Sequence, residues 1–326
     1  MTERPAFTFR AAQVFVAVVE AQSVTRAAQR LGMSASSVSQ QLANLESALE
    51  SRLVERTARM FRLTPAGALF LRRALALLDD ISAAKAELAL ADQAPQMTLR
   101  VATIGEFDGS VTPHWLGALG RRFPNIAFSI SSGASHENHD ALAHRAADLI
   151  LAVDAAEPAD RVESHDILRD AFVLVTPRDH ADVTDLAQLS DRPFLRYARD
   201  LYIGRQVEAA LRRGRIRPAH RYDFTTNRAL FTMVAQSGGW AVTTALAVLG
   251  TGEAARSLRV QRLPLPAFSR RLALHARRDA LGALPALMAR QLRRSIAAEM
   301  VPGLAGVSGL RAEDLGLLDI DTANPE

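Results

Sequence analysis

Two serines and one glycine divide the beginning of the chain into short helices separated by a tight turn. Ser23 and Ser34 can each cap the first turn of a helix, and Gly32 can adopt the positive φ that ends one. Apolar residues around these positions recur at the spacing of a buried helical stripe. The three stripes are Ala11, Val14, Phe15 and Val18; Val24, Ala27, Ala28 and Leu31; and Val38, Leu42, Leu45 and Leu49. Three short helices joined in this way predict a helix-turn-helix.

The segment after the third stripe predicts a β-hairpin. Residues Leu53–Leu63 place β-branched and aromatic residues on either side of a polar centre that contains arginine. We interpret this hairpin as a wing, so that residues 1–64 are expected to form a winged helix-turn-helix DNA-binding domain.

A long helix is expected from Pro65 to about Leu90. Proline is well tolerated at the first helical position, and no Gly or Pro lies between Gly67 and Leu90. One apolar series along it has spacings of 7, 4, 3 and 4, the pattern of a coiled-coil seam: Phe70, Leu77, Ile81, Ala84 and Leu88. This seam predicts that residues 65–90 form a linker helix that holds a homodimer together. The alternative is that the stripe packs on its own chain.

Positive charge is concentrated at the N-terminal end. The first 73 residues hold ten arginines and five glutamates, a net charge of +5, whereas the whole chain carries +4. A small basic domain is expected of a module that binds DNA phosphates, although a solvated basic surface is the alternative. The chain has no cysteine, which excludes disulfides, thiolate metal sites and cysteine nucleophiles.

Strands and helices alternate from Met97 onward, which predicts βαβ units and a largely parallel sheet after a hinge at residues 91–96. The expected strands are Thr98–Thr103, Ala127–Ser132, Leu149–Val153, Ala171–Thr176, Pro193–Tyr197, Ala219–Phe224, Trp240–Thr243 and Arg271–His275. Residues 301–326 form an acidic tail without clear periodicity, expected to be disordered or draped on the surface. The N-terminus lacks the long apolar run of a signal peptide, and no later apolar stretch is long enough to span a bilayer, so we expect a cytoplasmic protein.

Two motifs closely resemble the LysR-type transcriptional regulators. They are SVTRAAQRLGMSASSVSQQLANLE at Ser23–Glu46 and LVERTARMFRLTPAG at Leu53–Gly67. Looser likeness extends over nearly the whole chain, through Arg122-Phe-Pro-Asn, Ala147-Asp-Leu-Ile and Ser237-Gly-Gly-Trp-Ala-Val. The chain departs from the family pattern at Ala35, where Gln is common, and at Gln40, where Arg or Lys is frequent, which leaves the operator sequence open.

The resemblance implies an α/β protein in which the winged helix-turn-helix and linker helix precede a two-lobed effector domain like that of periplasmic binding proteins. This domain would span residues 91–300, with lobe one at about 97–165 and 268–300 and lobe two at about 166–267. The resemblance also implies a transcriptional regulator whose binding to double-stranded promoter DNA is modulated by a small-molecule effector. Assembly as a homodimer or homotetramer and contact with RNA polymerase are implied in the same way.

The candidate DNA-binding residues lie on the recognition helix, the preceding helix and the wing. A recognition helix presents its N-terminal residues to base edges in the major groove, where a carboxamide can pair with adenine. Arginines of the wing suit phosphates or the minor groove. The set is Thr25, Arg26, Ser34, Ser36, Ser37, Ser39, Gln40, Arg56, Arg59 and Arg62. The alternative is that Ser34 only caps its helix and the other polar residues face solvent.

The candidate effector-binding residues follow predicted strands, because ligands of open α/β sheets bind beyond the carboxyl ends of the strands. They are Thr103, Gly105, Glu106, Phe107, Ser131, Ser132, Tyr197, Thr226 and Trp240. A carboxylate between aromatic walls would suit a cationic or amine-bearing effector. The alternative is that Trp240 is a core residue and Glu106 points to water.

Other chemistries find little support. His136, His139, Asp140 and His144 fall in one predicted helix, but their spacing is a weak metal signal, and we interpret them as a solvated helix face. No metal or cofactor is expected. Phosphate-binding, nucleophile-elbow, dinucleotide and zinc-protease motifs are missing, so an enzyme is not expected. A solute-binding protein is the remaining rival, disfavoured by the DNA-binding module and by the lack of a signal peptide.

Overall fold

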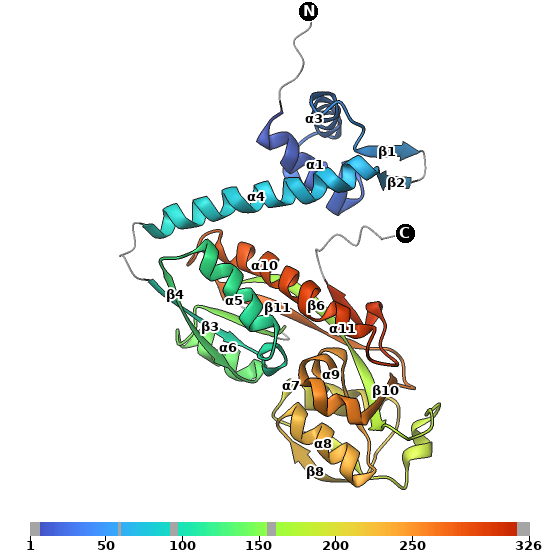
Figure 1. Ribbon diagram of the computed structural model, residues 1–326. Coiled ribbons are helices and arrows are strands. Elements are labelled where there is room, and N and C mark those ends of the chain that lie inside the picture. The colour runs from blue at the N-terminus through green and yellow to red at the C-terminus, as the bar shows by residue number, and fades with distance from the viewer. Residues whose placement is uncertain (1–6, 58–59, 92–96, 155–160, 318–326) are drawn as a thin grey trace, which may run out of the picture. The chain divides into compact units, whose positions relative to one another are not determined.

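The computed structural model describes residues 7–57, 60–91, 97–154 and 161–317, which fall into two compact units (Figure 1). The first unit contains α1 (Phe9–Ala21), α2 (Val24–Leu31), α3 (Ala35–Ala48) and an antiparallel hairpin of β1 (Val54–Thr57) and β2 (Met60–Leu63). The predicted caps are confirmed: the Ser23 hydroxyl accepts from the amide of Arg26, and Gly32 ends α2 with a φ of 62°. The three predicted stripes supply most of this unit's core.

The linker helix α4 spans Pro65–Ala91. The predicted seam is wrong at its first member, because Phe70 packs edge-on against Phe15 of α1 with ring centroids 5.2 Å apart. Leu71 and Ala74 are buried in the same core, which fastens the first turns of α4 to the helix-turn-helix. Leu77 is exposed to 38% and therefore offers apolar surface beyond this core.

The second unit is built on an eight-stranded mixed sheet. Its strands are β3 (Met97–Thr103), β4 (Ile126–Ser132), β5 (Leu149–Val153), β6 (Val162–Pro177), β9 (Ala241–Thr244), β10 (Leu258–Arg262), β11 (Ser269–Arg277) and β12 (Leu315–Leu317). Each of the eight predicted strands overlaps a strand of the structure. The predicted parallel character is wrong for most pairings, since only the β3–β4 and β3–β5 pairs of this sheet are parallel. β6 and β11 pair antiparallel with each other and with every other neighbour, because they carry the chain between two lobes.

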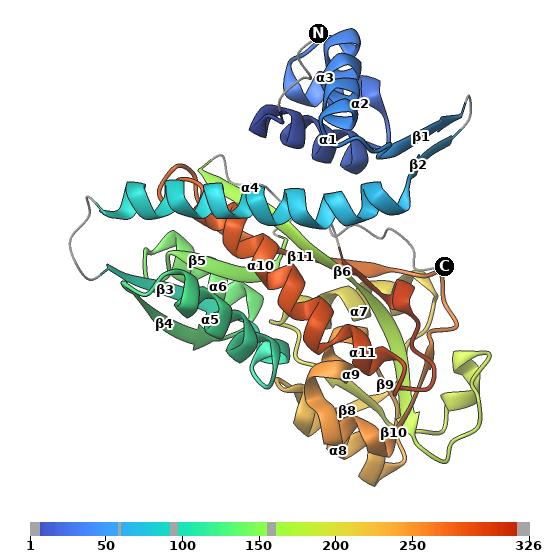
Figure 2. The ribbon, with the colours of Figure 1, turned by 45° about the horizontal axis from the view of Figure 1, so that its top comes forward.

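Lobe one consists of β3, β4 and β5 with α5 (Val111–Arg122), α6 (Ser135–Ala143) and α10 (Leu284–Glu299). Lobe two consists of β9 and β10, a parallel pair of β7 (Phe194–Tyr197) and β8 (His220–Phe224), and the helices α7 (Tyr202–Arg213), α8 (Asn227–Ser237) and α9 (Ala245–Thr251). Figure 2 shows β6 running from one lobe into the other. Short 3-10 turns occur at Gly105–Phe107 (η1), Leu186–Leu189 (η2), Gly252–Ser257 (η3) and Ala312–Asp314 (η4).

The described part of the tail is ordered, which contradicts the first of the two expected alternatives, disorder. It forms α11 (Val301–Leu304), η4 and β12, whose residues Leu315–Leu317 pair with Leu168–Asp170 of β6. Gly309 makes this path possible: it has a φ of 95°, and a Cβ there would lie 1.9 Å from the carbonyl oxygen of Val260. No helix among the described residues is long and apolar enough to cross a membrane.

Candidate functional site

The start of α3 presents a hydroxyl-rich surface. The Ser34 hydroxyl accepts from the amide of Ser37 at 3.1 Å, so its capping role is confirmed. It also lies 2.9 Å from the Ser36 hydroxyl and 2.7 Å from the Ser37 hydroxyl. All three serines are exposed, and Gln40, also exposed, donates from Nε2 to Asn44 at 2.9 Å. These polar groups can exchange their present partners for base edges in a groove.

The remaining candidates of the first unit are less closely grouped. Thr25 and Arg26 are exposed at the start of α2, Ser39 is half-buried on α3, and Arg62 is exposed on β2. Arg59 and the side chain of Arg56 lie outside the described residues.

We expect Ser36→Ala and Gln40→Ala each to weaken binding to a preferred DNA duplex by about 1–3 kcal/mol, because each substitution removes a group that can bond to a base edge. Binding to random duplex should change little, since phosphates dominate it. Fluorescence anisotropy on both duplexes measures the preference. An unaltered preference in both variants would remove these residues from the DNA interface.

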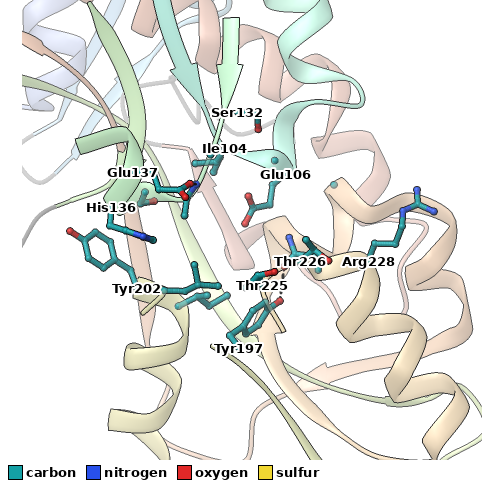
Figure 3. A pocket seen from close by; sticks show the side chains of 18 of the residues that line it. Ile104, Glu106, Ser132, His136, Glu137, Tyr197, Tyr202, Thr225, Thr226 and Arg228 are labelled. Carbon is teal, nitrogen blue, oxygen red and sulfur yellow. Dashed lines mark hydrogen bonds between the residues drawn. The ribbon is translucent and has the colours of Figure 1, made fainter. Parts of the chain in front are cut away.

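A cavity of about 600 Å³ lies between the lobes of the second unit, and we call it the interlobe cleft. Five of the nine predicted effector residues line it: Gly105, Glu106, Ser132, Tyr197 and Thr226. The first turns of α6, α7 and α8 also border it, which brings three helix N-termini to one cavity. In Figure 3, Glu106 points from lobe one toward Thr225 and Thr226 of lobe two.

Four predicted effector residues do not line the cleft. Phe107 is fully buried, and Trp240 is packed in the core of lobe two against Phe194, with ring centroids 4.5 Å apart. The Thr103 hydroxyl is buried and donates to the carbonyl of Ser131 at 3.3 Å. Ser131 is exposed, but successive strand residues point to opposite faces, so Ser132 faces the cleft and Ser131 does not. Strand periodicity and residue type alone did not reveal these directions.

The floor of the cleft holds a buried charge cluster that the sequence did not predict. Arg270 of β11 donates from Nε to Asp170 of β6 at 2.8 Å and from Nη2 to Glu106 at 2.9 Å. Asp170 is fully buried and also accepts from the amide of Leu246, at the start of α9. Burial acts to lower the pKa of Arg270, but the two carboxylates raise it above its usual value. At their formal charges, one cation and two carboxylates give this floor a net negative charge, and burial raises the pKa of Asp170 above its usual value.

The same region joins the two lobes tightly. A Cβ on Gly250 of α9 would lie 2.3 Å from the carbonyl oxygen of Glu106, so only glycine allows α9 to approach η1 this closely. Within lobe two, the Tyr197 hydroxyl donates to Asn227 at 2.7 Å and lies 2.7 Å from the Thr243 hydroxyl. Burial raises the pKa of this phenol, so it stays protonated. A ligand bound near Glu106 would therefore act on contacts that set the relation between the lobes.

The solvated face predicted for the four polar residues at 136–144 is correct for Asp140 and His144, which are exposed, and wrong for His136 and His139. His136 is half-buried and lines the cleft, and the ring of His139 lies 5.2 Å from that of His275 on β11. Of the three histidines at 136–144, only His144 is exposed. Among the described residues, no group of three or more His, Cys, Asp or Glu side chains could hold a metal ion.

His275 makes stability depend on pH. Burial, with His139 nearby, lowers its pKa to about 4, against about 6.5 in an unfolded chain. Above about pH 6.5 both states are neutral, and below it only the unfolded state gains a proton, so stability falls as pH drops toward 4. We expect the drop between pH 7.5 and 5 to be smaller in His275→Gln by about 2 kcal/mol, as measured by urea unfolding. Identical pH profiles would exclude His275 as the source.

Comparison with known proteins follows the same division of the chain. Residues 9–68 match the family model of the bacterial regulatory helix-turn-helix protein, lysR family, and residues 92–297 match that of the LysR substrate binding domain. The chain is 34% identical over 173 residues to a probable hydrogen peroxide-inducible genes activator of Mycobacterium xenopi, covering 53% of this chain and 91% of the relative. It is 28% identical over 251 residues to the uncharacterized HTH-type transcriptional regulator YfeR of Shigella flexneri, covering 74% and 80%.

Solved structures share the fold. A C206 mutant of OxyR from Corynebacterium glutamicum superposes with a TM-score of 0.56 and 22% identity, covering 95% of this chain and 98% of the other. CrgA from Neisseria meningitidis, a LysR-type transcriptional regulator, gives a TM-score of 0.56 and 20% identity, covering 89% and 99%.

Proposed function

We propose that this chain, which belongs to the LysR family of bacterial transcriptional regulators, binds promoter DNA through α2, α3 and the wing and is modulated by a small molecule in the interlobe cleft. The observation that supports modulation by a small molecule is the cleft itself, since both lobes line it and Glu106 lies at their contact. A ligand that changes this contact changes how the lobes are held, which is the differential interaction that a shift of conformation requires.

The division of labour follows the family. Residues 1–64 would contact DNA, residues 65–90 would join two protomers, and residues 91–300 would bind the effector. Assembly into homodimers or homotetramers, residence in the cytoplasm and contact with RNA polymerase complete the proposal. The family is one of regulators, and we assign the chain no enzymatic step.

The chemistry of the cleft favours an amine-bearing or cationic effector. Arg270 is shared between Asp170 and Glu106, so the three groups together remain negative. Glu106 and Arg270 both line the cavity. Oε1 of Glu106 accepts from Arg270, which leaves Oε2 as an acceptor for a ligand. The mycobacterial relative is named for hydrogen peroxide, but this chain has no cysteine, so sensing by thiol oxidation is not available to it.

A thermal-shift screen of metabolites on the full-length protein identifies the effector, because ligand binding stabilises the folded state. We then expect Glu106→Gln to bind that effector about tenfold to a hundredfold more weakly in calorimetry, because one charge-assisted hydrogen bond is lost. Asp108→Asn is the matched control, since Asp108 is exposed and does not line the cleft. Equal affinities in wild type and Glu106→Gln, or an effector that proves to be a carboxylate, would refute the charge preference and leave the regulator assignment intact.

A further inference from the structure

A second cavity, of about 360 Å³, lies in lobe two beside α7 and β7, and we call it the arginine cavity. Four arginines line it with a single acidic side chain, Glu208; the arginines are Arg196, Arg199, Arg212 and Arg217. It shares only Tyr197 with the interlobe cleft. The proposed function leaves this cavity unused.

The arginines belong to the most basic stretch of the chain. Residues 192–228 hold ten arginines against three acidic residues, a net charge of +7, although the whole chain carries only +4. Outside this stretch and the first 73 residues, the chain is therefore acidic. Such segregation raises the positive potential around this part of lobe two.

Two of the four arginines are already neutralised. Arg196 makes a two-pronged ion pair with Asp223, at 2.6 and 3.1 Å, which raises its pKa. Arg199 pairs with Glu208 at 3.0 Å. Arg212 and Arg217 are exposed and have no acidic partner among the described residues. The cavity thus carries two guanidinium groups whose charge the protein does not balance.

Helix energetics do not account for this pair. Arg212 lies in the last turn of α7, where a cation is favoured by the helix dipole. Arg217 lies beyond the helix, after a turn in which Arg215 takes a φ of 58°, so the dipole gives no reason for a cation there. The turn nevertheless brings Arg217 to the same cavity as Arg212.

We propose that the arginine cavity binds a small organic anion, with a carboxylate or phosphate between Arg212 and Arg217 and an apolar body on the cavity floor. Guanidinium groups match both kinds of anion in geometry and charge. The floor is apolar and includes Val207, Leu211 and Ile216. A concave site of this size suits a small molecule better than the convex backbone of duplex DNA.

Occupancy of the arginine cavity would reach the interlobe cleft through shared elements. Tyr197 lines both cavities, and a Cβ on Gly204 would lie 2.2 Å from the carbonyl oxygen of Ala198, so α7 is packed directly on the end of β7. A second ligand would therefore tune the response to the first. This consequence rests on the proposed function, whereas anion binding does not.

Calorimetry of the full-length protein with phenyl phosphate and benzoate tests the site, with phenol as the uncharged match. We expect saturable binding of at least one anion and none of phenol. The double variant Arg212→Gln/Arg217→Gln should bind the anion about tenfold more weakly or worse, the loss of affinity expected when a charge-assisted hydrogen bond is removed. Arg213→Gln/Arg215→Gln, which changes two exposed arginines outside the cavity, should weaken it less than about twofold, because screened surface charge contributes little.

Four results would overturn the proposal. The first is that neither anion binds the wild type. The second is equal weakening in both double variants, which would mean general attraction to a basic surface. The third is that Glu106→Gln strengthens anion binding about tenfold or more, the change expected when a carboxylate beside a bound anion loses its charge, which would put the anion in the interlobe cleft. Displacement of bound phenyl phosphate by random duplex DNA would also contradict it, since the surface would then serve a polyanion.

Discussion

Arg270→Met is expected to destabilise the second unit by about 3–5 kcal/mol, because it removes the only cation that contacts fully buried Asp170 among the described residues. Methionine keeps much of the side-chain volume of arginine, so the loss of stability would come from the missing charge and not from a cavity. Urea unfolding of the full-length protein at neutral pH measures the change.

Two control variants separate the buried cluster from surface charge. Arg271→Met alters the next residue, whose side chain is exposed to 48% and pairs with Asp154 and Asp166, and should cost less than about 1 kcal/mol. Asp170→Asn added to Arg270→Met should recover part of the stability, since a neutral amide needs no counter-ion. If Arg270→Met were no worse than Arg271→Met, the cluster would not hold the lobes together.

Leu77→Glu with Ile81→Glu is expected to abolish the dimer. Leu77 is exposed on α4 beyond the core that holds Phe70, so it is available to a partner helix. A carboxylate buried in such a seam without a counter-ion costs about 3–5 kcal/mol, which is more than a hundredfold in the dimer constant. Tight DNA binding should be lost with it.

Analytical ultracentrifugation gives the oligomeric state directly. Ala76→Glu, an exposed position of α4 outside the predicted seam, is the control and should leave the dimer intact. A double variant that sediments like the wild type would mean that residues 77–88 pack within one chain or at no interface.

The helix-turn-helix could be predicted because its signals are local. Ser23 and Ser34 cap helices through backbone amides three residues away, and Gly32 terminates a helix by its own φ. The stripes act over one or two turns. None of these signals depends on distant parts of the chain, so the sequence alone was sufficient.

The floor of the cleft could not be predicted because its members are brought together by the sheet. Asp170 and Arg270 are 100 positions apart and meet only because β6 and β11 pair antiparallel. A hint was present, since Asp170 stands directly before the apolar run of Ala171–Val175, where an acid must be buried with a partner. The prediction that Trp240 lines the cleft was wrong because its signal is ambiguous: an aromatic residue near a strand end fits a cavity rim and a core equally well.

The most direct test of the account is the affinity of the full-length protein for a duplex that it selects from a random library, compared with a scrambled duplex, over a series of salt concentrations. We expect the selected duplex to bind about a thousandfold more tightly or better. We also expect the logarithm of the affinity to fall linearly with the logarithm of the salt concentration, because phosphate contacts release counterions. Equal affinity for both duplexes, or affinity insensitive to salt, would contradict it.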